Sequence, residues 1–422
     1  MHQFTPKGNN AIRLSILMGF ASLLVVAGVV YSPSEAFRAS LTGLQIWWTQ
    51  VFPGLLPPLI LAELLATSGL LHGLATLSEP LTRLLFRLPG ASGWAIAFGW
   101  CAGIPVGALE TSRLRERELI QDDDVDTLLI VSHFPNPFLI ILVIGCGFLQ
   151  SPMLGWAIAI GLWLSVIITG IIWAHFVKGK KYTRIHDSSN TTPEDFRASD
   201  ALASPSLFER ALDVASTVRE SDSRPFGKQL ADSVSRTVTT LMIIGGLMMM
   251  CSVFIRLLQI WMPGNDFWIT FAGLYDMHLG AYEGSKSALF ASAPVYTAAL
   301  LAAALAWSGW SGLLQARAAF GAASPFPWGR LIAGRLLHGG IALLITFPLA
   351  SFFTSEQVAL FANRYLPFHW RSVDAWASDQ PLPNGWLHLS DTLIVAIASF
   401  SVFLLLALAA ALIRPKPPKN RD

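Results

Sequence analysis

The chain has 422 residues, of which 53% are hydrophobic and only 13% are charged, whereas soluble domains typically carry about 25% charged residues. This composition excludes an ordinary soluble domain and indicates a protein embedded in a lipid bilayer. The net charge of +2 argues neither for nor against nucleic acid, and we expect no nucleic-acid partner.

Several apolar runs approach or exceed the roughly 20 residues that cross a bilayer as a helix. They predict an all-α polytopic membrane protein with about eight transmembrane helices. The expected spans, in chain order, are 14–32, 53–72, 127–149, 153–177, 238–261, 287–307, 329–352 and 390–413. The aromatic-rich segment 35–52 is amphipathic and should lie in the membrane interface, with Trp47 and Trp48 at headgroup depth.

Two further segments, 91–110 and 266–284, are too polar and too rich in glycine to be simple spans. Irregular backbone at membrane depth is tolerated only where it is buried in protein or lines a polar cavity. We therefore expect two re-entrant hairpins in addition to the eight spans.

A short phrase occurs twice in the chain. Residues 107–113 read GALETSR and residues 280–286 read GAYEGSK, so both contain Gly-Ala-x-Glu-x-Ser followed by a cation. At nearly the same spacing, 132–137 falls opposite 308–313. A duplicated membrane unit with a polar, interrupted centre indicates a binding or transport site between two repeats. The alternative is accidental similarity between apolar segments.

Lysine and arginine flank the apolar runs unevenly, and the positive-inside rule predicts the orientation. The basic clusters at 83–117, 178–184 and 414–421 should be cytoplasmic. This places both termini in the cytoplasm and the chain in the cell membrane as a multi-pass protein. The first hairpin then enters from the cytoplasm and the second from outside, so the two repeats are inverted, as in many secondary transporters.

These features divide the chain into six expected regions. They are an N-terminal span with an interfacial segment (1–43), a first repeat (44–177), a polar cytoplasmic linker (178–236), a second repeat (237–352), an extracytoplasmic loop (353–389), and a last span with a basic cytoplasmic tail (390–422). The linker mixes basic, acidic and hydroxyl residues and should be solvated and partly disordered.

Two interruptions of apolar spans carry the first group of candidate site residues. Two prolines at 135 and 137 remove backbone donors and release carbonyls, and Ser132 and Asn136 add oxygen ligands for Na⁺ or a polar solute. The matching interruption has two glycines, with Ser308 and Ser311, followed by Gln315. A packed proline kink is the structural alternative.

Four acidic residues form the second group. Glu63 lies within an apolar run and must be paired, protonated or facing a cavity, and Arg256 is one partner that we consider for it. Glu110 and Glu283 occupy equivalent positions, each three residues before a cation, so a helix-end ion pair is the alternative to solute or cation binding. Asp276 adds a polar group within the second hairpin.

The sequence carries no signature of a soluble enzyme. A P-loop, a GxGxxG motif after a strand, an HExxH motif and a GxSxG motif are all missing. The three cysteines lie in apolar runs without CxxC spacing, so disulfides and cysteine-based metal sites are not expected. We expect no enzyme and no cofactor or bound metal, with Na⁺ or H⁺ as the coupling ion of a transporter.

Several longer segments resemble the YlbJ family of sporulation integral membrane proteins, within the larger group of Gate, or nucleoside-recognition, domain proteins. The segments are LQIWWTQVFPGLLPPLILAELL, LTRLLFRLPG, GIPVGALETSRL, SHFPNPF, SGWSGLLQARAAF and RLIAGRLLHGG. The resemblance implies a role in forming the endospore cortex. It also implies a fold similar to the core of concentrative nucleoside transporters, in which two inverted repeats of a hairpin and a broken helix hold nucleoside and Na⁺.

The resemblance assigns the repeated residues to that core. Carried over, Gly107 and Glu110 belong to the first hairpin, Ser132 and Asn136 to the first broken helix, Gly280 and Glu283 to the second hairpin, and Ser308, Ser311 and Gln315 to the second broken helix.

Two functions fit these features. The first is a transporter that moves an unknown small polar or anionic solute across the bilayer. The second is a scaffold that recruits other sporulation proteins, such as those that assemble the spore cortex or coat, through the 178–236 linker. Polar residues that converge between the repeats favour the transporter.

Overall fold

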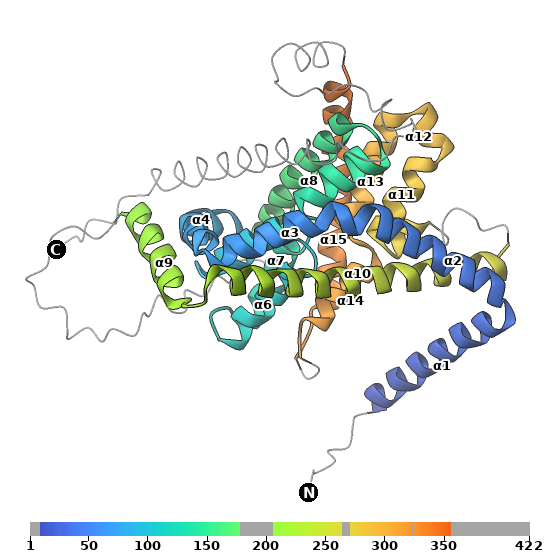
Figure 1. Cartoon of the computed structure of the whole chain (residues 1–422), viewed down its shortest axis with the longest axis horizontal. Helices are drawn as coiled ribbons and strands as arrows, with labels where there is room; N and C mark the ends of the chain where they lie inside the picture. Colours follow the sequence, from blue (N-terminus) through green and yellow to red (C-terminus); the bar gives the residue numbers. More distant parts are fainter. Residues whose placement is uncertain (1–8, 178–205, 264–270, 322–323, 356–422) are drawn as a thin grey trace, which may run out of the picture.

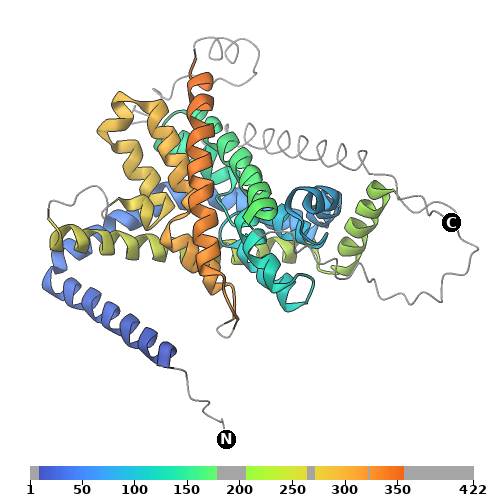
Figure 2. The ribbon, with the colours of Figure 1, turned by 180° about the vertical axis from the view of Figure 1, so that it is seen from behind.

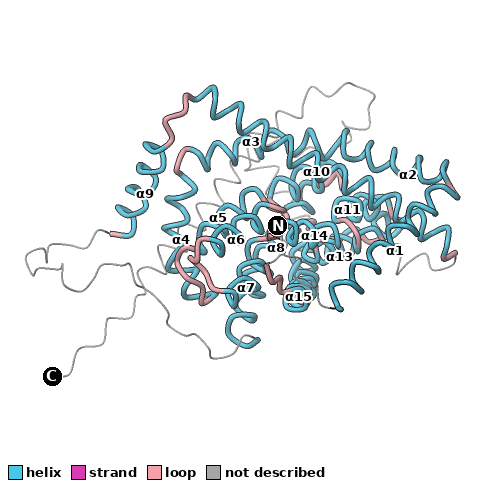
Figure 3. Tube along the Cα trace, turned by 90° about the horizontal axis from the view of Figure 1, so that it is seen from below, coloured by secondary structure: helices cyan, strands magenta, loops and turns pink. Residues whose placement is uncertain are grey.

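The computed structural model describes residues 9–177, 206–263, 271–321 and 324–355. Every secondary-structure element within these ranges is a helix (Figures 1 and 3). In chain order they are α1 (Asn9–Tyr31), α2 (Pro33–Ile46), the π-helix η1 (Trp47–Val51), α3 (Phe52–Thr67), α4 (Leu70–Phe86), α5 (Ser92–Ala102), α6 (Val106–Glu116), α7 (Asp122–Ser132), the π-helix η2 (Leu139–Phe148), α8 (Pro152–Ile172), the π-helix η3 (Trp173–Val177), α9 (Leu207–Ser221), α10 (Phe226–Trp261), the 3₁₀-helix η4 (Ala272–Leu274), α11 (Met277–Lys286), α12 (Ala288–Ser292), α13 (Pro294–Trp307), α14 (Gly309–Ala318) and α15 (Trp328–Phe353).

The expected all-α membrane protein is confirmed, with fewer long spans than the eight expected. Five helical stretches within the described residues are long and apolar enough to cross a bilayer. They are Pro33–Thr67, Pro152–Val177, Phe226–Trp261, Pro294–Ala318 and Trp328–Phe353. The expected span 14–32 is a shorter apolar helix, 127–149 is split in two, and 390–413 lies outside the described residues.

Two groups of long helices cross each other in the body of the protein. Helix α10 runs beside α2 and α3, while α8, α13 and α15 cross this layer (Figures 1 and 2). Helix α15 packs against both α8 and α13. The shorter helices α5, α6, α7, α11 and α14 fill the space around this crossing, and the two interrupted spans lie there (Figure 3).

The segment 35–52 continues through η1 into α3 as one helical stretch, and its place in the membrane interface stays a prediction. Trp47 is buried in the protein, and its Nε1 donates to the carbonyl of Leu241 at 2.9 Å. Gly245 of α10 has no side chain to block the indole, so the ring packs directly on its Cα. Trp48 is exposed, as expected of an interfacial tryptophan.

The end of the expected linker is ordered. Ser206 and Glu209 form a reciprocal capping box that starts α9, and α10 already begins at Phe226. Helix α9 packs closely on α4, because Gly69 and Gly73 let its backbone approach. Residues 207–221 of the linker therefore form a packed helix, while 178–205 lies outside the described residues.

Candidate functional site

The first break is the interruption at residues 133–136 between α7 and η2. Pro135 and Pro137 cannot donate backbone hydrogen bonds, so α7 cannot continue through them. Asn136 replaces part of the lost pairing, since its Oδ1 accepts from the backbone N–H of Leu139 at 2.8 Å. Its Nδ2 donates to the carbonyl of Ala102 at 3.0 Å. Asn136 therefore starts the second half of the broken helix and ties it to the α5–α6 hairpin.

The turn of that hairpin requires glycine. Gly103 has a φ of +78°, and a Cβ at this position would lie 2.9 Å from both the Cβ and the backbone nitrogen of Asn136. Gly107 lies one turn beyond, where a Cβ would meet the carbonyl of Ser132. The hairpin and the first break are therefore in direct backbone contact.

This contact makes Gly103→Ala a test of the packing. With φ of +78° and ψ of −146°, Gly103 lies in a backbone region that is essentially restricted to glycine, so a Cβ there costs about 1–3 kcal/mol, and the clash with Asn136 adds to that cost. We expect a lower thermal unfolding midpoint in detergent. Gly246→Ala on α10 is the matched control, because nothing lies within 4 Å of that position and helix propensity favours alanine by up to about 1 kcal/mol. Equal midpoints for the two variants would contradict the contact.

The second break lies at Ser308, between α13 and α14. Ser308 and Gly309 both have positive φ, of 67° and 70°, which ends α13 without a proline. The freed N–H of Ser311 donates to the carbonyl of Tyr275 at 2.8 Å. The Ser311 hydroxyl donates to Oδ2 of Asp276 at 2.7 Å. Like Asn136 at the first break, Ser311 ties the broken helix to the segment that precedes the repeated phrase.

The two breaks meet at Gly312. Nε2 of His133 lies 3.0 Å from the carbonyl of Gly312, and Ile104 of the hairpin turn packs against the same residue. Ser132, Asn136, Ser308 and Ser311 are all buried in this region. The structure thus brings together the candidate residues of both interrupted spans.

Asp276 is buried beside the second break and begins α11. Its Oδ1 accepts from the backbone N–H groups of His278 and Leu279 at 2.9 and 3.1 Å. The same oxygen lies 3.2 Å from Nδ1 of His278. One carboxylate therefore caps α11 and holds a buried imidazole and the Ser311 hydroxyl.

Arg335 on α15 was missed by the sequence reasoning. Among the described residues it is the largest side chain that is fully buried. Its Nη2 donates to the carbonyl of Leu129 at 2.9 Å and to the carbonyl of His133. Its Nε and Nη1 have no partner within the described residues, and no carboxylate there pairs with it. The signal in the sequence was an arginine within the apolar run LIAGRLLHGG.

Two buried histidines lie near this guanidinium. His133 belongs to the first break and His338 to α15, and both are close enough to Arg335 to interact with its charge. The Nδ1 atom of each ring has no partner among the described residues. Arg335 and these rings form a buried polar cluster at the carboxyl end of α7.

The repeated glutamates differ in their surroundings. Glu110 is buried and accepts from Arg113 at 2.5 Å and from Nε1 of Trp94 at 2.7 Å, so the helix-end ion pair is present at the first position. Glu283 is exposed, and within the described part of the chain Lys286 lies over the Tyr282 ring instead, at 5.9 Å. Glu110 and Glu283 occupy matching positions of the repeated phrase but make different contacts.

Glu63 lies away from both breaks. Its Oε2 accepts from Nε of Arg236 at 2.9 Å, and Arg256 instead pairs with Glu35 at 2.7 Å. The Glu63–Arg256 pair considered from sequence is therefore wrong, because α10 presents Arg236 to α3.

The last two candidates lie on α11 and α14. Gly280 packs against Gly273 of η4. Gln315 is buried on α14, and its Oε1 has no partner within the described residues. No group of three or more His, Cys, Asp or Glu side chains in the described ranges is arranged to hold a metal ion.

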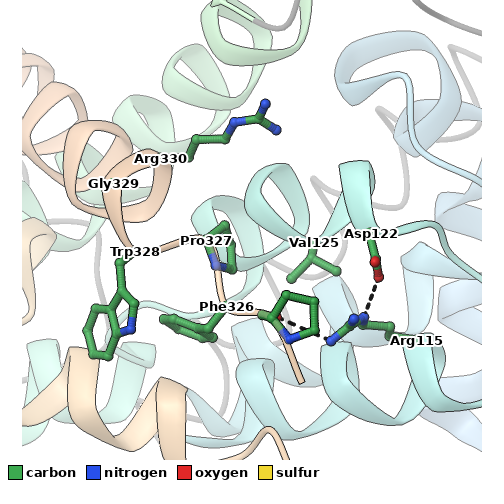
Figure 4. A pocket seen from close by; sticks show the side chains of 9 residues that line it. Arg115, Asp122, Val125, Phe326, Pro327, Trp328, Gly329 and Arg330 are labelled. Carbon is green, nitrogen blue, oxygen red and sulfur yellow. Dashed lines mark hydrogen bonds and ion pairs between the residues drawn. The ribbon is translucent and has the colours of Figure 1, made fainter. Parts of the chain in front are cut away.

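A pocket of about 500 Å³ opens between the start of α7, the end of α6 and the segment before α15 (Figure 4). Arg115 crosses it, bound to Asp122 at 2.6 Å and to the carbonyl of Pro325 at 3.3 Å. Arg330 lies at its rim, 3.5 Å from the buried carboxylate of Asp126. Arg335 follows five residues later on α15, about 7.5 Å further along the helix axis.

The sequence is similar to a known sporulation membrane protein. It is 34% identical over 246 residues to the sporulation integral membrane protein YlbJ of Bacillus subtilis (strain 168). The match covers 58% of this chain and 57% of that protein, so it spans less than two thirds of the relative. This finding supports the resemblance to YlbJ-like proteins that the motifs indicate.

The other two comparisons add nothing to this relationship. No protein-family model matches the chain, and no solved structure matches it. The wider resemblance to Gate domains and nucleoside transporters therefore stays a prediction from sequence.

Proposed function

We propose that this chain is a multi-pass membrane protein of spore formation that carries a small anionic solute, bound at Arg335 beside the first break. The observation that carries this proposal is the fully buried guanidinium with no carboxylate partner in the described part of the chain. The similarity to YlbJ supports the link to sporulation.

An anionic ligand would offset the free-energy cost of burying the charge of Arg335. Removing an unpaired ion from water costs several kcal/mol even after the protein relaxes. The carbonyls of Leu129 and His133 lie at the negative end of the α7 dipole and offset part of this cost. Nε and Nη1 of Arg335 have no hydrogen-bond partner within the described residues. A carboxylate or phosphate oxygen would supply both the missing charge and the missing acceptors.

Access to Arg335 would run along α7 and α15 from the pocket in Figure 4. Of the ion pairs at its rim, Arg115–Asp122 lies within the first half of the chain and Arg330–Asp126 joins the two halves. Both arginines are bound by carboxylates, so neither is free to bind an anion while these pairs are formed. Separation of these pairs would open the path to the buried cluster.

The inverted-repeat mechanism is part of the same proposal. Each half contributes a segment that ends in the repeated phrase and a broken helix bound to it, through Asn136 in the first half and Ser311 in the second. Two such units around one site suit alternating access, in which one unit rocks against the other. The scaffold function needs no such convergence.

Binding tests the proposal on the purified full-length protein. Inorganic phosphate and succinate are the anionic probes, and uridine is the neutral comparison that the nucleoside-transporter resemblance suggests. We expect at least one anion to raise the thermal midpoint, since a ligand at 100 times its Kd stabilises by about 2.7 kcal/mol. Uptake of the same labelled anion into proteoliposomes should follow.

Three results would argue otherwise. Stabilisation by uridine alone would favour a nucleoside site. Stabilisation by an anion without uptake would contradict transport. Sporulation that depends on 185–230 but not on Arg335 would favour the scaffold.

A further inference from the structure

The contacts of His278 determine which of its nitrogens carries a proton. Its side chain and that of Asp276 are each 1% exposed, and Nδ1 lies 3.2 Å from Oδ1. An ionised carboxylate only accepts hydrogen bonds, so Nδ1 must be the donor. Nε2 of the neutral ring then carries a lone pair, and it has no partner among the described residues. A proton that binds there converts the pair into an imidazolium facing a carboxylate.

The oxygens of Asp276 are poorly placed to hold Na⁺. Oδ1 already accepts from two backbone N–H groups and faces Nδ1 of His278, and Oδ2 accepts from Ser311. A sodium ion would have to displace donors that cap α11. Protonation of Nε2 leaves all four of these hydrogen bonds in place.

We propose that Asp276 and His278 form a proton-binding site that couples solute movement to H⁺. This assignment rests on the proposed transport function, and it selects H⁺ over Na⁺ as the coupling ion. The proton comes from water on one side of the membrane, binds Nε2 and leaves to water on the other side. No bond other than N–H forms or breaks.

Ser311 links the proton to the second break. When the His278 ring is neutral, no positive charge competes with the Ser311 hydroxyl for the carboxylate of Asp276. When the His278 ring is protonated, its positive charge faces Oδ1 of Asp276 and weakens the attraction of Oδ2 for the Ser311 hydroxyl. The strength of the contact between α11 and α14 therefore depends on the proton, and this contact must change if the broken helix moves relative to the hairpin.

Other titratable groups around α11 do not replace His278 as the partner of Asp276. Cys251 of α10 is bound to the neighbouring residue instead, with its Sγ 3.8 Å from the carbonyl of Tyr275. Arg256 of α10 is bound by Glu35 of α2. The remaining titratable or charged side chains on α11 and the elements packed against it are Arg38, Cys146, Lys228, Asp232, Arg236, Tyr282, Glu283, Lys286, Tyr296 and Arg317, and none of them bonds to Asp276 within the described residues.

The first test follows the proton without any solute. Purified full-length protein with ¹⁵N-labelled histidine rings is titrated by NMR between pH 5.5 and 8.5, and His278→Gln identifies the signal. We expect the ¹⁵N shifts of His278 to show that Nδ1 carries the proton of the neutral ring and that a proton is added at Nε2 as the pH is lowered. In Asp276→Asn this protonation should be less favourable, because an adjacent carboxylate favours the charged ring. A His278 signal that stays neutral throughout, or ignores Asp276→Asn, would overturn the proposal.

The second test separates coupling from transport. Proteoliposomes loaded with a pH dye receive a gradient of phosphate or succinate, whichever anion the wild-type protein takes up. We expect His278→Gln to abolish the accompanying proton movement, and His175→Gln to leave it unchanged, since the bond of His175 within the described residues is to the carbonyl of Ile171. Proton movement that persists in His278→Gln would overturn the coupling role. Absence of uptake by the wild-type protein would instead refute the transport function, while the NMR titration still decides the proton site.

Discussion

Arg335→Met should abolish the stabilisation of the protein by phosphate or succinate while leaving it folded. Burying an ion costs several kcal/mol even after the protein relaxes, and an apolar side chain of similar volume removes that cost. The variant also frees the carbonyls of Leu129 and His133, at a cost of about 1–3 kcal/mol for each buried group left unpaired. These effects oppose each other, so we expect a small change in midpoint without ligand and complete loss of the anion response. Melting curves with and without each anion measure both.

The control for this variant is an arginine that already has a carboxylate partner. Arg236→Met removes the pair with Glu63 on a helix of similar character, and we expect the anion response to persist. Arg335→Lys keeps the charge with fewer donors and should retain part of the response. An intact response in Arg335→Met would place anion binding elsewhere. A collapse of the fold, together with no anion response in the wild-type protein, would make Arg335 structural.

The sequence predicted the breaks well because local chemistry determines them. Two prolines at 135 and 137 stop α7 whatever surrounds them, and Asn136 is a residue that readily caps the next helix. The second break was placed by its repeat position, and two glycines there were consistent with it. Its conformation depends on Ser308 in a positive-φ region, which the residue type alone does not specify.

Pairings between distant helices could not be predicted in the same way. Arg256 was the partner considered for Glu63, but it lies about 30 Å from Arg236 along the axis of α10. Only the position of α10 along α3 and α2 places Arg236 at Glu63 and Arg256 at Glu35. Trp47 is buried because Gly245 faces it across 198 residues of sequence. Arg335 carried a usable signal, an arginine in an apolar run, but its lack of a carboxylate partner is visible only in three dimensions.

Asp276→Ala should lower the free energy of unfolding more than any other single change around the second break. Loss of a helix N-cap costs about 0.5–2 kcal/mol, and Asp276 caps two backbone N–H groups of α11. The variant also leaves the Ser311 hydroxyl and the His278 ring without their partner in a buried region, at about 1–3 kcal/mol for an unpaired buried group. We expect a total loss of about 2–4 kcal/mol, measured by thermal or denaturant unfolding in detergent.

Two variants separate the contributions of cap, charge and burial. Asp276→Asn keeps an oxygen for the α11 cap and should lose about 1 kcal/mol or less, so most of the stability does not require the negative charge. Ser206→Ala removes the exposed cap of α9 and should cost about 1 kcal/mol. If Asp276→Ala cost no more than Ser206→Ala, the buried bonds to Ser311 and His278 would contribute little. The second break would then depend on its other contacts, which include the backbone bond from Ser311 to Tyr275 and the contact of His133 with Gly312.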